Sequence, residues 1–362
     1  MSELNLLPTE DEETLRATVA SFLAKRCDTD SVRHVYDGDR SAVEPLWRGL
    51  AQELGLAGLL VPEDLGGAGA SAREAAVVLE QVGGAVAPVP FLTSSVIATT
   101  VLLAQEATDA GRDLLARLAS GERTAALAVP FPALSCRTAA ERVTSVAGAL
   151  EADVLLVPVA RDGGVAVLAV EASAARVEPV SSLDMSRQLA DVTLDAGRGE
   201  VVVPATSGAQ AVDRALLTGA GLLASEQVGL AAWCLLTTVA YLKERRQFGR
   251  VVGGFQAIKH RLADLYVAVE SANGAARHAA AALAADDPDS TLAVHLAAAY
   301  CGDAAVLAAE EAVQLHGGIG MTWEHPAHLF LKRAKASQVA LGTPGHHRDR
   351  LAGLVDLPAP VA

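Results

Sequence analysis

The stretch AYLKERRQFGRVVGGFQAIKHRLAD, residues 240–264, decides how this chain is organised. It starts as the end of an apolar helix and brings together four cations, Lys243, Arg245, Arg246 and Arg250. Glycines at positions 249, 253 and 254 interrupt it, and a second amphipathic helix follows from Phe255. Guanidinium groups bind phosphate oxygens in pairs, and glycines let a backbone approach a ligand closely. The stretch therefore indicates a phosphate site, although cations at a helix C-terminus also simply complement the helix dipole.

The composition favours closely packed helices in more than one domain. With 362 residues the chain is too long for one ordinary core, so two or three domains are expected. Hydrophobic residues make up 51% of the chain but aromatic residues only 4%, so small aliphatic side chains carry the core. The formal net charge of −14 argues against nucleic acid as a partner, because phosphate contacts supply most of that affinity. Any bound anion must therefore occupy a local basic site, and the cluster around Arg245 is the best candidate.

Cysteine spacing and the N-terminus indicate a protein of a reducing compartment. The four cysteines are scattered, without the spacing of a zinc site or a disulfide framework: Cys27, Cys136, Cys234 and Cys301. The first fifteen residues are acidic and do not resemble a signal peptide. The longest apolar run, residues 219–241, is interrupted by Glu226. We therefore expect a soluble, cytoplasmic protein without a membrane partner.

Hydrophobic periodicity divides the chain into three parts. Residues 1–121 predict an N-terminal all-helical domain, with Ser71 and Glu74 as the capping box of one helix. Residues 122–205 carry short β-branched runs separated by turn residues, which predicts a small antiparallel β domain. Residues 206–362 predict a C-terminal helical bundle. Its expected helices span 210–246, 255–285, 289–315, 324–339 and 344–355. Several are apolar on more than one face, so we expect an oligomer.

Three pieces of the C-terminal bundle resemble the acyl-CoA dehydrogenase family. The first is R-x-x-F-G at residues 245–249 followed by Gln256, and the second is QLHGGIG at residues 314–320. The third is MTWEHP at residues 321–326, which runs into LKRA at residues 331–334. The resemblance covers nearly the whole chain and implies the layout described above, mainly helical with a central β domain.

The resemblance also implies a flavin dinucleotide, FAD, shared with a neighbouring subunit. In the family, R-x-x-F-G and Q-x-x-G-G reach across to the flavin held by that subunit. By this resemblance, Arg245 would bind the pyrophosphate of FAD. Gln247 and Gln256 would make polar contacts with the cofactor, and Phe248 would pack beside the flavin. It also places five residues along the ADP half: Gln314, Leu315, His316, Gly317 and Gly318. Fixed positive charge and exposed glycine N–H groups suit such an anion. For Gln314 the alternative is a plain helix-end residue capped by Gly317.

The catalytic carboxylate of the family does not have a counterpart at either expected position. Acyl-CoA dehydrogenation needs a carboxylate to remove the α-proton of the thioester while hydride leaves the β-carbon. Family members place this glutamate before the last helix or near the start of the helix that ends in R-x-x-F-G. The matching residues here are Leu341 and Gly219. The β domain departs as well: residues 128–132 and 155–158 lack the hydroxyl-bearing loop and the tryptophan strand that hold a flavin.

The resulting hypothesis is a subunit that lacks the base but contributes to a partner's flavin. Some bacterial members of the family, associated with steroid side chains, are α2β2 heterotetramers, and this chain resembles their non-catalytic member. Its implied partners are an acyl-CoA substrate, a homologous catalytic subunit, and an electron-transfer flavoprotein or similar acceptor. One alternative is a self-sufficient homo-oligomer with a displaced base such as Glu226, for which a salt-bridged core acid is the competing interpretation. Another is an acyl-CoA-binding scaffold without redox chemistry.

Other polar residues receive no chemical role at this point. Asp184 and Arg187 match a sequence pattern that is common in the family, and we assign them no chemical role. His325 and the pair His346–His347 do not have metal-ligand partners at suitable spacing, so we expect no metal site and interpret them as surface or turn residues.

Overall fold

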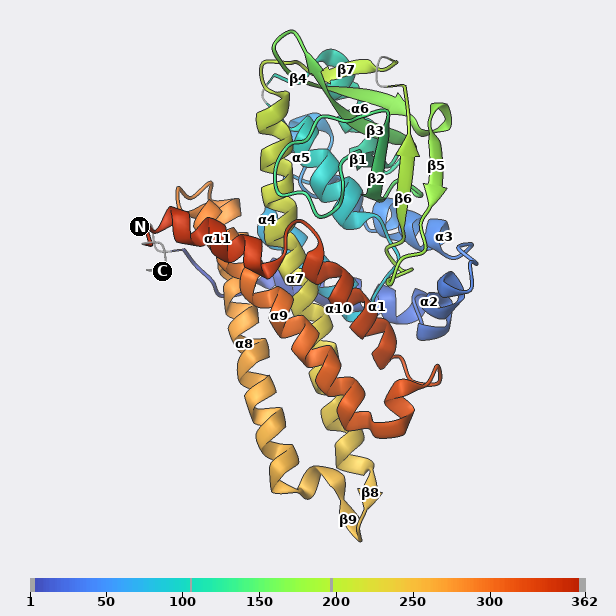
Figure 1. Ribbon diagram of the computed structural model, residues 1–362, viewed down its shortest axis with the longest axis vertical. Coiled ribbons are helices and arrows are strands. Elements are labelled where there is room, and N and C mark those ends of the chain that lie inside the picture. Colours follow the sequence, from blue (N-terminus) through green and yellow to red (C-terminus); the bar gives the residue numbers. More distant parts are fainter. Residues whose placement is uncertain (1–3, 105, 196–197, 358–362) are drawn as a thin grey trace, which may run out of the picture.

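The computed structural model describes residues 4–104, 106–195 and 198–357. It is mainly helical, with a small β region between an N-terminal group of helices and a C-terminal bundle (Figure 1). The β region and most N-terminal helices form one end of an elongated molecule, and the bundle extends away from them (Figure 1). This arrangement confirms the predicted fold class.

Side-chain caps begin several of the N-terminal helices. The Thr9 and Glu12 side chains form a capping box at the start of α1, and Ser71 and Glu74 form the predicted one at the start of α4. The helical elements are α1 Glu10–Arg26, α2 Thr29–Tyr36, α3 Val43–Arg48, η1 Gly49–Glu53, η2 Leu56–Gly58, η3 Glu63–Leu65, α4 Ala72–Gly84, η4 Phe91–Ala98, α5 Thr99–Leu102 and α6 Asp109–Ala119.

The β region consists of two sheets. The elements are β1 Ala125–Leu127, β2 Arg142–Ala147, β3 Val154–Arg161, β4 Gly164–Glu171, η5 Ala172–Ala174, β5 Arg176–Pro179, β6 Leu189–Thr193 and β7 Glu200–Val203. One sheet has the order β1-β3-β4-β7 and the other β2-β6-β5. Pairing is antiparallel as predicted, except that β1 pairs with β3 in parallel. The apolar runs of the sequence, at 125–129, 154–159, 165–170, 192–194 and 200–203, overlap five of these strands. They miss β2 and β5, because β2 mixes polar with apolar residues and β5 is a short strand with no buried residue.

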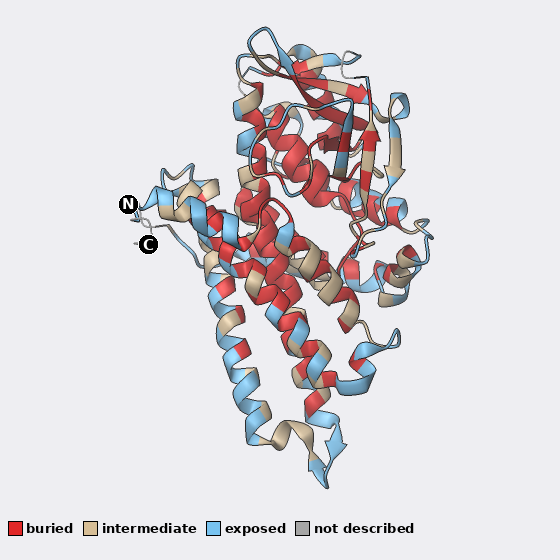
Figure 2. Ribbon diagram, viewed as in Figure 1, coloured by how far each residue is buried: buried red, intermediate tan, exposed pale blue. Residues whose placement is uncertain are grey.

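The C-terminal part begins with α7 Gly208–Glu244, a continuous helix of 37 residues. It is followed by β8 Arg246–Gln247, β9 Arg250–Val251, η6 Val252–Gly254, α8 Gln256–Ala284, α9 Ser290–His316, η7 Gly317–Met321, α10 Ala327–Val339 and α11 Pro344–Leu354. The helices agree with the predicted ranges within three residues. The apolar helices α7 and Ser290–Met321 have the length and composition of membrane spans, but 72% of each apolar window is buried inside the protein. These two helices are apolar because they form the core of the protein, and Figure 2 shows the buried stretches of α7 and α9.

Two glycines allow α4 to lie directly against α7. A Cβ atom at Gly83 would lie 2.0 Å from the carbonyl oxygen of Glu226, and one at Gly229 would lie 1.8 Å from that of Glu80. Any side chain at either position would therefore force the helices apart. This crossing places Glu226 at the centre of the molecule.

A buried ionic network joins all parts of the chain. Asp184, in the loop between β5 and β6, pairs with Nε of Arg333 on α10 at 3.0 Å. Glu226 on α7 pairs with Nη1 of Arg333 at 3.6 Å and with Arg187 of the same β5–β6 loop. The hydroxyl of Tyr36, at the end of α2, donates to Asp184 at 3.0 Å. The four charged side chains are each at most 9% exposed, and two guanidinium groups balance two carboxylates.

We expect Arg333→Met to destabilise the fold by about 3–5 kcal/mol, because it leaves two buried carboxylates with one partner between them. Urea unfolding monitored by circular dichroism measures this loss. Lys335→Met on the same helix is the control. Its ammonium pairs with Glu310 at the surface, so that variant loses less than about 1 kcal/mol. Equal small losses in both variants would contradict a central role for the network.

Candidate functional site

The sequence 245–256 folds into an exposed arm at the far end of α7. Arg245 ends the helix in an extended conformation, and its N–H donates to the carbonyl of Tyr241 at 2.9 Å. Strands β8 and β9 form a hairpin whose two turn residues, Phe248 and Gly249, have φ values of 53° and 75°. A two-residue hairpin turn of type I′ has positive φ at both positions. The phenylalanine–glycine pair therefore builds the tip of the arm (Figure 1).

The arm presents free cations and an aromatic ring to its surroundings. Phe248 is 87% exposed, and its ring meets that of Phe255 edge-on with centroids 6.2 Å apart. Arg250 is held within the arm, because it stacks on Phe255 and donates to the carbonyl of Gly254 at 2.6 Å. Within the described part of the chain, the guanidinium group of Arg245 has neither a hydrogen bond nor an ion pair. It is available to an anion from outside.

The second predicted segment lies at the same end of the bundle. His316, the last residue of α9, is buried, and its ring stacks on Tyr241 with centroids 4.5 Å apart. Tyr241 is one helical turn before Arg245, so this stack ties the C-terminus of α9 to the base of the arm. Gln314 is exposed and Leu315 is half-buried. Arg261 of α8 and Glu311 of α9 reinforce the junction with hydrogen bonds of 2.6 and 2.9 Å.

The glycine turn after α9 leaves backbone open to a ligand. Gly317 caps the helix with φ 64°, and its N–H donates to the carbonyl of Gln314. A Cβ atom at Gly317 or Gly318 would meet nothing within 4 Å. The glycine at position 317 thus allows α9 to end with a positive φ. The free space beside the backbone of Gly317 and Gly318 is suited to a nucleotide. The Tyr241–His316 stack puts the 314–318 segment at the end of the bundle that carries Arg245, and Gln247 and Gln256 are exposed.

The two positions at which the resembling family places its base touch each other here. A Cβ atom at Gly219 would lie 3.1 Å from Cδ1 of Leu341 and 2.8 Å from Cγ1 of Ile97. Leu341 is 1% exposed, and its N–H donates to the carbonyl of Phe131 at 2.8 Å. The space beside them is a cavity of about 20 Å³. That volume holds about one water molecule, not an acyl chain.

Apolar side chains close this cavity, so we call it the plugged pocket. Its lining is Thr93, Ile97, Leu127, Val129, Phe131, Ala147, Leu216 and Leu341. The one polar group in this set, the Thr93 hydroxyl, donates to the carbonyl of Pro90 at 3.2 Å. Val129 and Phe131 belong to the loop that departs from the family's flavin-binding pattern. None of the lining residues could accept a proton from a substrate.

Glu226, the predicted substitute base, is engaged in the ionic network instead. Its two carboxylate oxygens face Arg187 and Arg333, and the side chain is 1% exposed. It also lies two helical turns, about 10 Å, along α7 from Gly219. Arg333, Asp184, Arg187 and Tyr36 were not identified from the sequence as a functional group of residues. The only local sign was an arginine, Arg333, within an apolar helix.

The prediction for His347 was wrong, because this residue is buried rather than at the surface. It is 1% exposed, and its Nδ1 lies 2.8 Å from Nδ1 of His295 on α9. Its Nε2–H donates to the carbonyl of Leu341 at 3.0 Å. His347 therefore fixes the Leu341 turn, which has a positive φ of 51°. Sequence reasoning missed this pair, since the two rings come from helices 52 residues apart.

His325 is also more enclosed than predicted. It is half-buried and lies against His316, with ring centroids 4.0 Å apart. Burial is the largest cause that lowers the pKa of His325 to about 4, followed by the charges of His316 and Arg33. Within the described residues, histidines, cysteines and carboxylates do not form a cluster of three that could bind a metal ion.

Comparison with known proteins agrees with this geometry. The family descriptions "Acyl-CoA dehydrogenase, N-terminal domain" and "Acyl-CoA dehydrogenase, C-terminal domain" match residues 9–122 and 206–354. Acyl-CoA dehydrogenase IpdE2 of Mycobacterium tuberculosis is 38% identical over 346 residues, covering 96% of this chain and 98% of that protein. IpdE2 of Mycolicibacterium smegmatis is 36% identical over 343 residues, covering 94% and 98%.

Two solved structures are similar over their whole length. A variant of the Tcur3481–Tcur3483 steroid ACAD is 28% identical with a TM-score of 0.83, covering 96% of this chain and 98% of that chain. The ChsE4–ChsE5 complex from Mycobacterium tuberculosis is 26% identical with a TM-score of 0.84, covering 98% and 100%.

We expect the protein to lose stability as the pH falls from about 6.5 to about 4. Burial is the largest cause that lowers the pKa of His347 to about 4, followed by the charge of His295. Burial likewise lowers the pKa of His328 to about 4. Between the two pH values the unfolded chain binds protons that the folded chain does not, so the stability from these neutral rings is complete above pH 6.5 and is lost toward pH 4.

Urea unfolding at pH 7.0, 5.5 and 4.5 measures this loss. His347→Gln keeps a donor for the carbonyl of Leu341 but cannot titrate, so its stability falls less steeply with pH. His346→Gln, at the exposed neighbouring position, is the control and keeps the full pH dependence. Identical pH profiles for the wild type and His347→Gln would refute the assignment.

Proposed function

The chain belongs to the acyl-CoA dehydrogenase family, and we propose from this premise that it is the non-catalytic subunit of a heteromeric, FAD-dependent acyl-CoA dehydrogenase. The observation that carries the proposal is a contrast within one chain. Gly219 and Leu341 close the plugged pocket with apolar groups, whereas Arg245 on the arm is exposed and unpaired within the described residues. The chain has kept the contacts that serve another subunit's site and has lost those of its own.

In this proposal the arm and the α9 turn hold the cofactor of the partner subunit. Arg245 binds the pyrophosphate, Gln247 and Gln256 contact polar groups of the dinucleotide, and Phe248 packs beside the flavin ring. The segment Gln314–Gly318 lies along the ADP half, where glycine leaves the backbone accessible. FAD, when bound, accepts the hydride that leaves the acyl β-carbon. The partner supplies the carboxylate that removes the α-proton.

Exposed apolar side chains support assembly with a second chain. Helices α8 and α9 leave five large apolar side chains in solvent: Tyr266, Val267, Leu296, Tyr300 and Leu307. Such residues on a soluble protein mark interaction surfaces when they gather. The similarity to the ChsE4–ChsE5 complex and to a steroid ACAD supports a homologous partner in an α2β2 assembly. We propose a steroid-derived acyl-CoA as substrate and an electron-transfer flavoprotein or similar acceptor.

The structure weighs against the two alternatives. A homo-oligomer that uses Glu226 as base would need a free carboxylate near the substrate, but Glu226 is paired with two arginines and lies two turns from Gly219. A scaffold without redox chemistry does not account for an unpaired Arg245 beside an open glycine turn.

We expect the purified chain alone to be colourless and inactive toward acyl-CoA thioesters. Co-expression with a homologous catalytic subunit should give a yellow complex with one FAD per two chains, because in this proposal only the partner's pocket is open. Absorbance at the flavin band and a protein assay give this ratio. A yellow lone chain that reduces an electron acceptor would end the proposal.

Arg245→Gln should weaken FAD binding by the complex about 10- to 100-fold, because charge-assisted hydrogen bonds contribute about 1.5–3 kcal/mol. Fluorescence titration of the flavin-free complex measures the dissociation constant. Arg246→Gln removes the same charge from the next, equally exposed position and should change it less than about threefold. If both variants weakened FAD binding equally, Arg245 would contribute only general positive charge and would not bind the pyrophosphate directly.

A further inference from the structure

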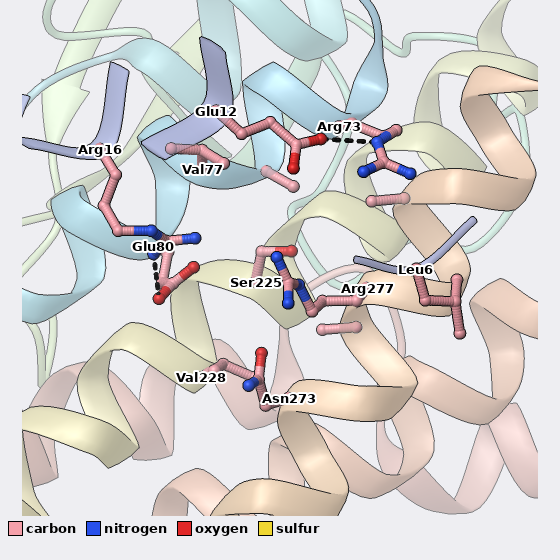
Figure 3. A pocket seen from close by; sticks show the side chains of 13 residues that line it. Leu6, Glu12, Arg16, Arg73, Val77, Glu80, Ser225, Val228, Asn273 and Arg277 are labelled. Atoms are coloured by element: carbon pink, nitrogen blue, oxygen red, sulfur yellow. Dashed lines mark hydrogen bonds and ion pairs between the residues drawn. The ribbon is translucent and has the colours of Figure 1, made fainter. Parts of the chain in front are cut away.

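A small cavity lies between four helices, on a part of the fold that the proposed function does not use. It is lined by α1, α4, α7 and α8 and has a volume of about 30 Å³ (Figure 3). A water-sized sphere needs about 10–15 Å³ of such volume, so the space holds two waters or one ion of similar size. Dinucleotides and acyl chains are far too large for it.

Arginines dominate the charge of the lining. Three guanidinium groups, of Arg16, Arg73 and Arg277, face two carboxylates, of Glu12 and Glu80, which leaves one positive charge. Two ion pairs of 2.5 Å join Arg16 to Glu80 and Arg73 to Glu12, and Figure 3 shows both. The third cation has no carboxylate left.

Arg277 is the unmatched cation. It is half-buried on α8, and among the residues that the structure describes it makes no hydrogen bond or ion pair. Two further polar side chains line the same cavity without a hydrogen-bond partner in the described part of the chain, Ser225 of α7 and Asn273 of α8. In Figure 3 the Arg277 guanidinium lies beside Ser225. The Arg277 guanidinium only donates hydrogen bonds, and the Ser225 hydroxyl and the Asn273 amide can donate as well, so all three side chains can donate to an anion in the cavity.

The ion pairs around the cavity are fixed by the surrounding structure. Glu12 is 2% exposed and also accepts from the N–H of Thr9 in the capping box of α1. Arg73 donates to the carbonyls of Asn5 and Leu7 besides pairing with Glu12. Glu12 therefore cannot turn toward Arg277 without giving up these bonds. Two more carboxylates lie outside the lining: Glu13 is half-exposed, 3.9 Å from Arg16, and Glu74 caps α4.

We propose that this cavity binds a small monovalent inorganic anion such as chloride, held by Arg277, Asn273 and Ser225. The anion accepts hydrogen bonds from these three side chains and neutralises the one positive charge that the lining has in excess. All three ligands belong to the bundle, and the cavity lies where α7 and α8 meet the N-terminal helices α1 and α4. This site is separate from the arm and the plugged pocket, so its failure would leave the proposed function untouched.

Thermal unfolding of the full chain in two salts tests the site. At constant ionic strength, replacing sodium gluconate by sodium chloride should raise the Tm by about 1–3 °C and saturate, because an ion bound only by the folded state stabilises it by mass action. Gluconate is too large for the cavity, so it controls for screening. Arg277→Gln should abolish the difference between the salts. Lys259→Gln, which removes one charge from an exposed position of the same helix, should retain it.

Bromide gives a direct readout that does not depend on a variant folding. A wild-type crystal soaked in millimolar bromide should show an anomalous peak within hydrogen-bond distance of the Arg277 guanidinium. Two water peaks there without bromide, or bromide bound only at molar concentration, would overturn the proposal. Equal Tm values in chloride and gluconate, or a chloride effect retained by Arg277→Gln, would do the same.

Discussion

Two buried carboxylates and two buried guanidinium groups hold this molecule together. Removing each charge from water costs several kcal/mol, and only close pairing offsets that cost. Asp184 and Arg187 come from the β region, Glu226 from α7 and Arg333 from α10, so the charges are balanced only when all these parts are in place. Arg333 also donates to the carbonyl of Ala87 at 3.0 Å, which adds the end of α4. The network therefore specifies how the N-terminal helices, the sheets and the bundle are assembled.

The same network explains why the interior of this chain is poorly suited to proton transfer. A general base needs an accessible lone pair near the substrate, and Glu226 has neither access nor proximity to Gly219. Leu341 fills the neighbouring position, and the His347 side chain fixes its turn. The side chains around Gly219 and Leu341 are therefore apolar, whereas the charged groups of the arm lie outside the fold.

Sequence periodicity predicted the long helices well, because their apolar faces recur over many turns and glycines or prolines mark their ends. It missed β2 and β5, whose pairing is decided by neighbours distant in the chain. For the site, the motifs at 245–249 and 314–318 are local, so their proximity at one end of the bundle could be anticipated. The ionic network and the His295–His347 pair could not. Their members come from separate elements, and each residue alone resembles an ordinary surface charge or turn histidine.

The continuity of α7 has a consequence for how the gene can change. The helix carries Gly219 beside the plugged pocket and ends one residue before Arg245, so a rigid rod of about 1.5 Å per residue separates the two. One inserted or deleted codon between them would rotate the hairpin by about 100° around the rod and point it away from its target. Between Gly219 and Arg245 the chain therefore tolerates substitutions but not insertions or deletions. The number of residues between the plugged pocket and the hairpin is fixed by the geometry of the helix.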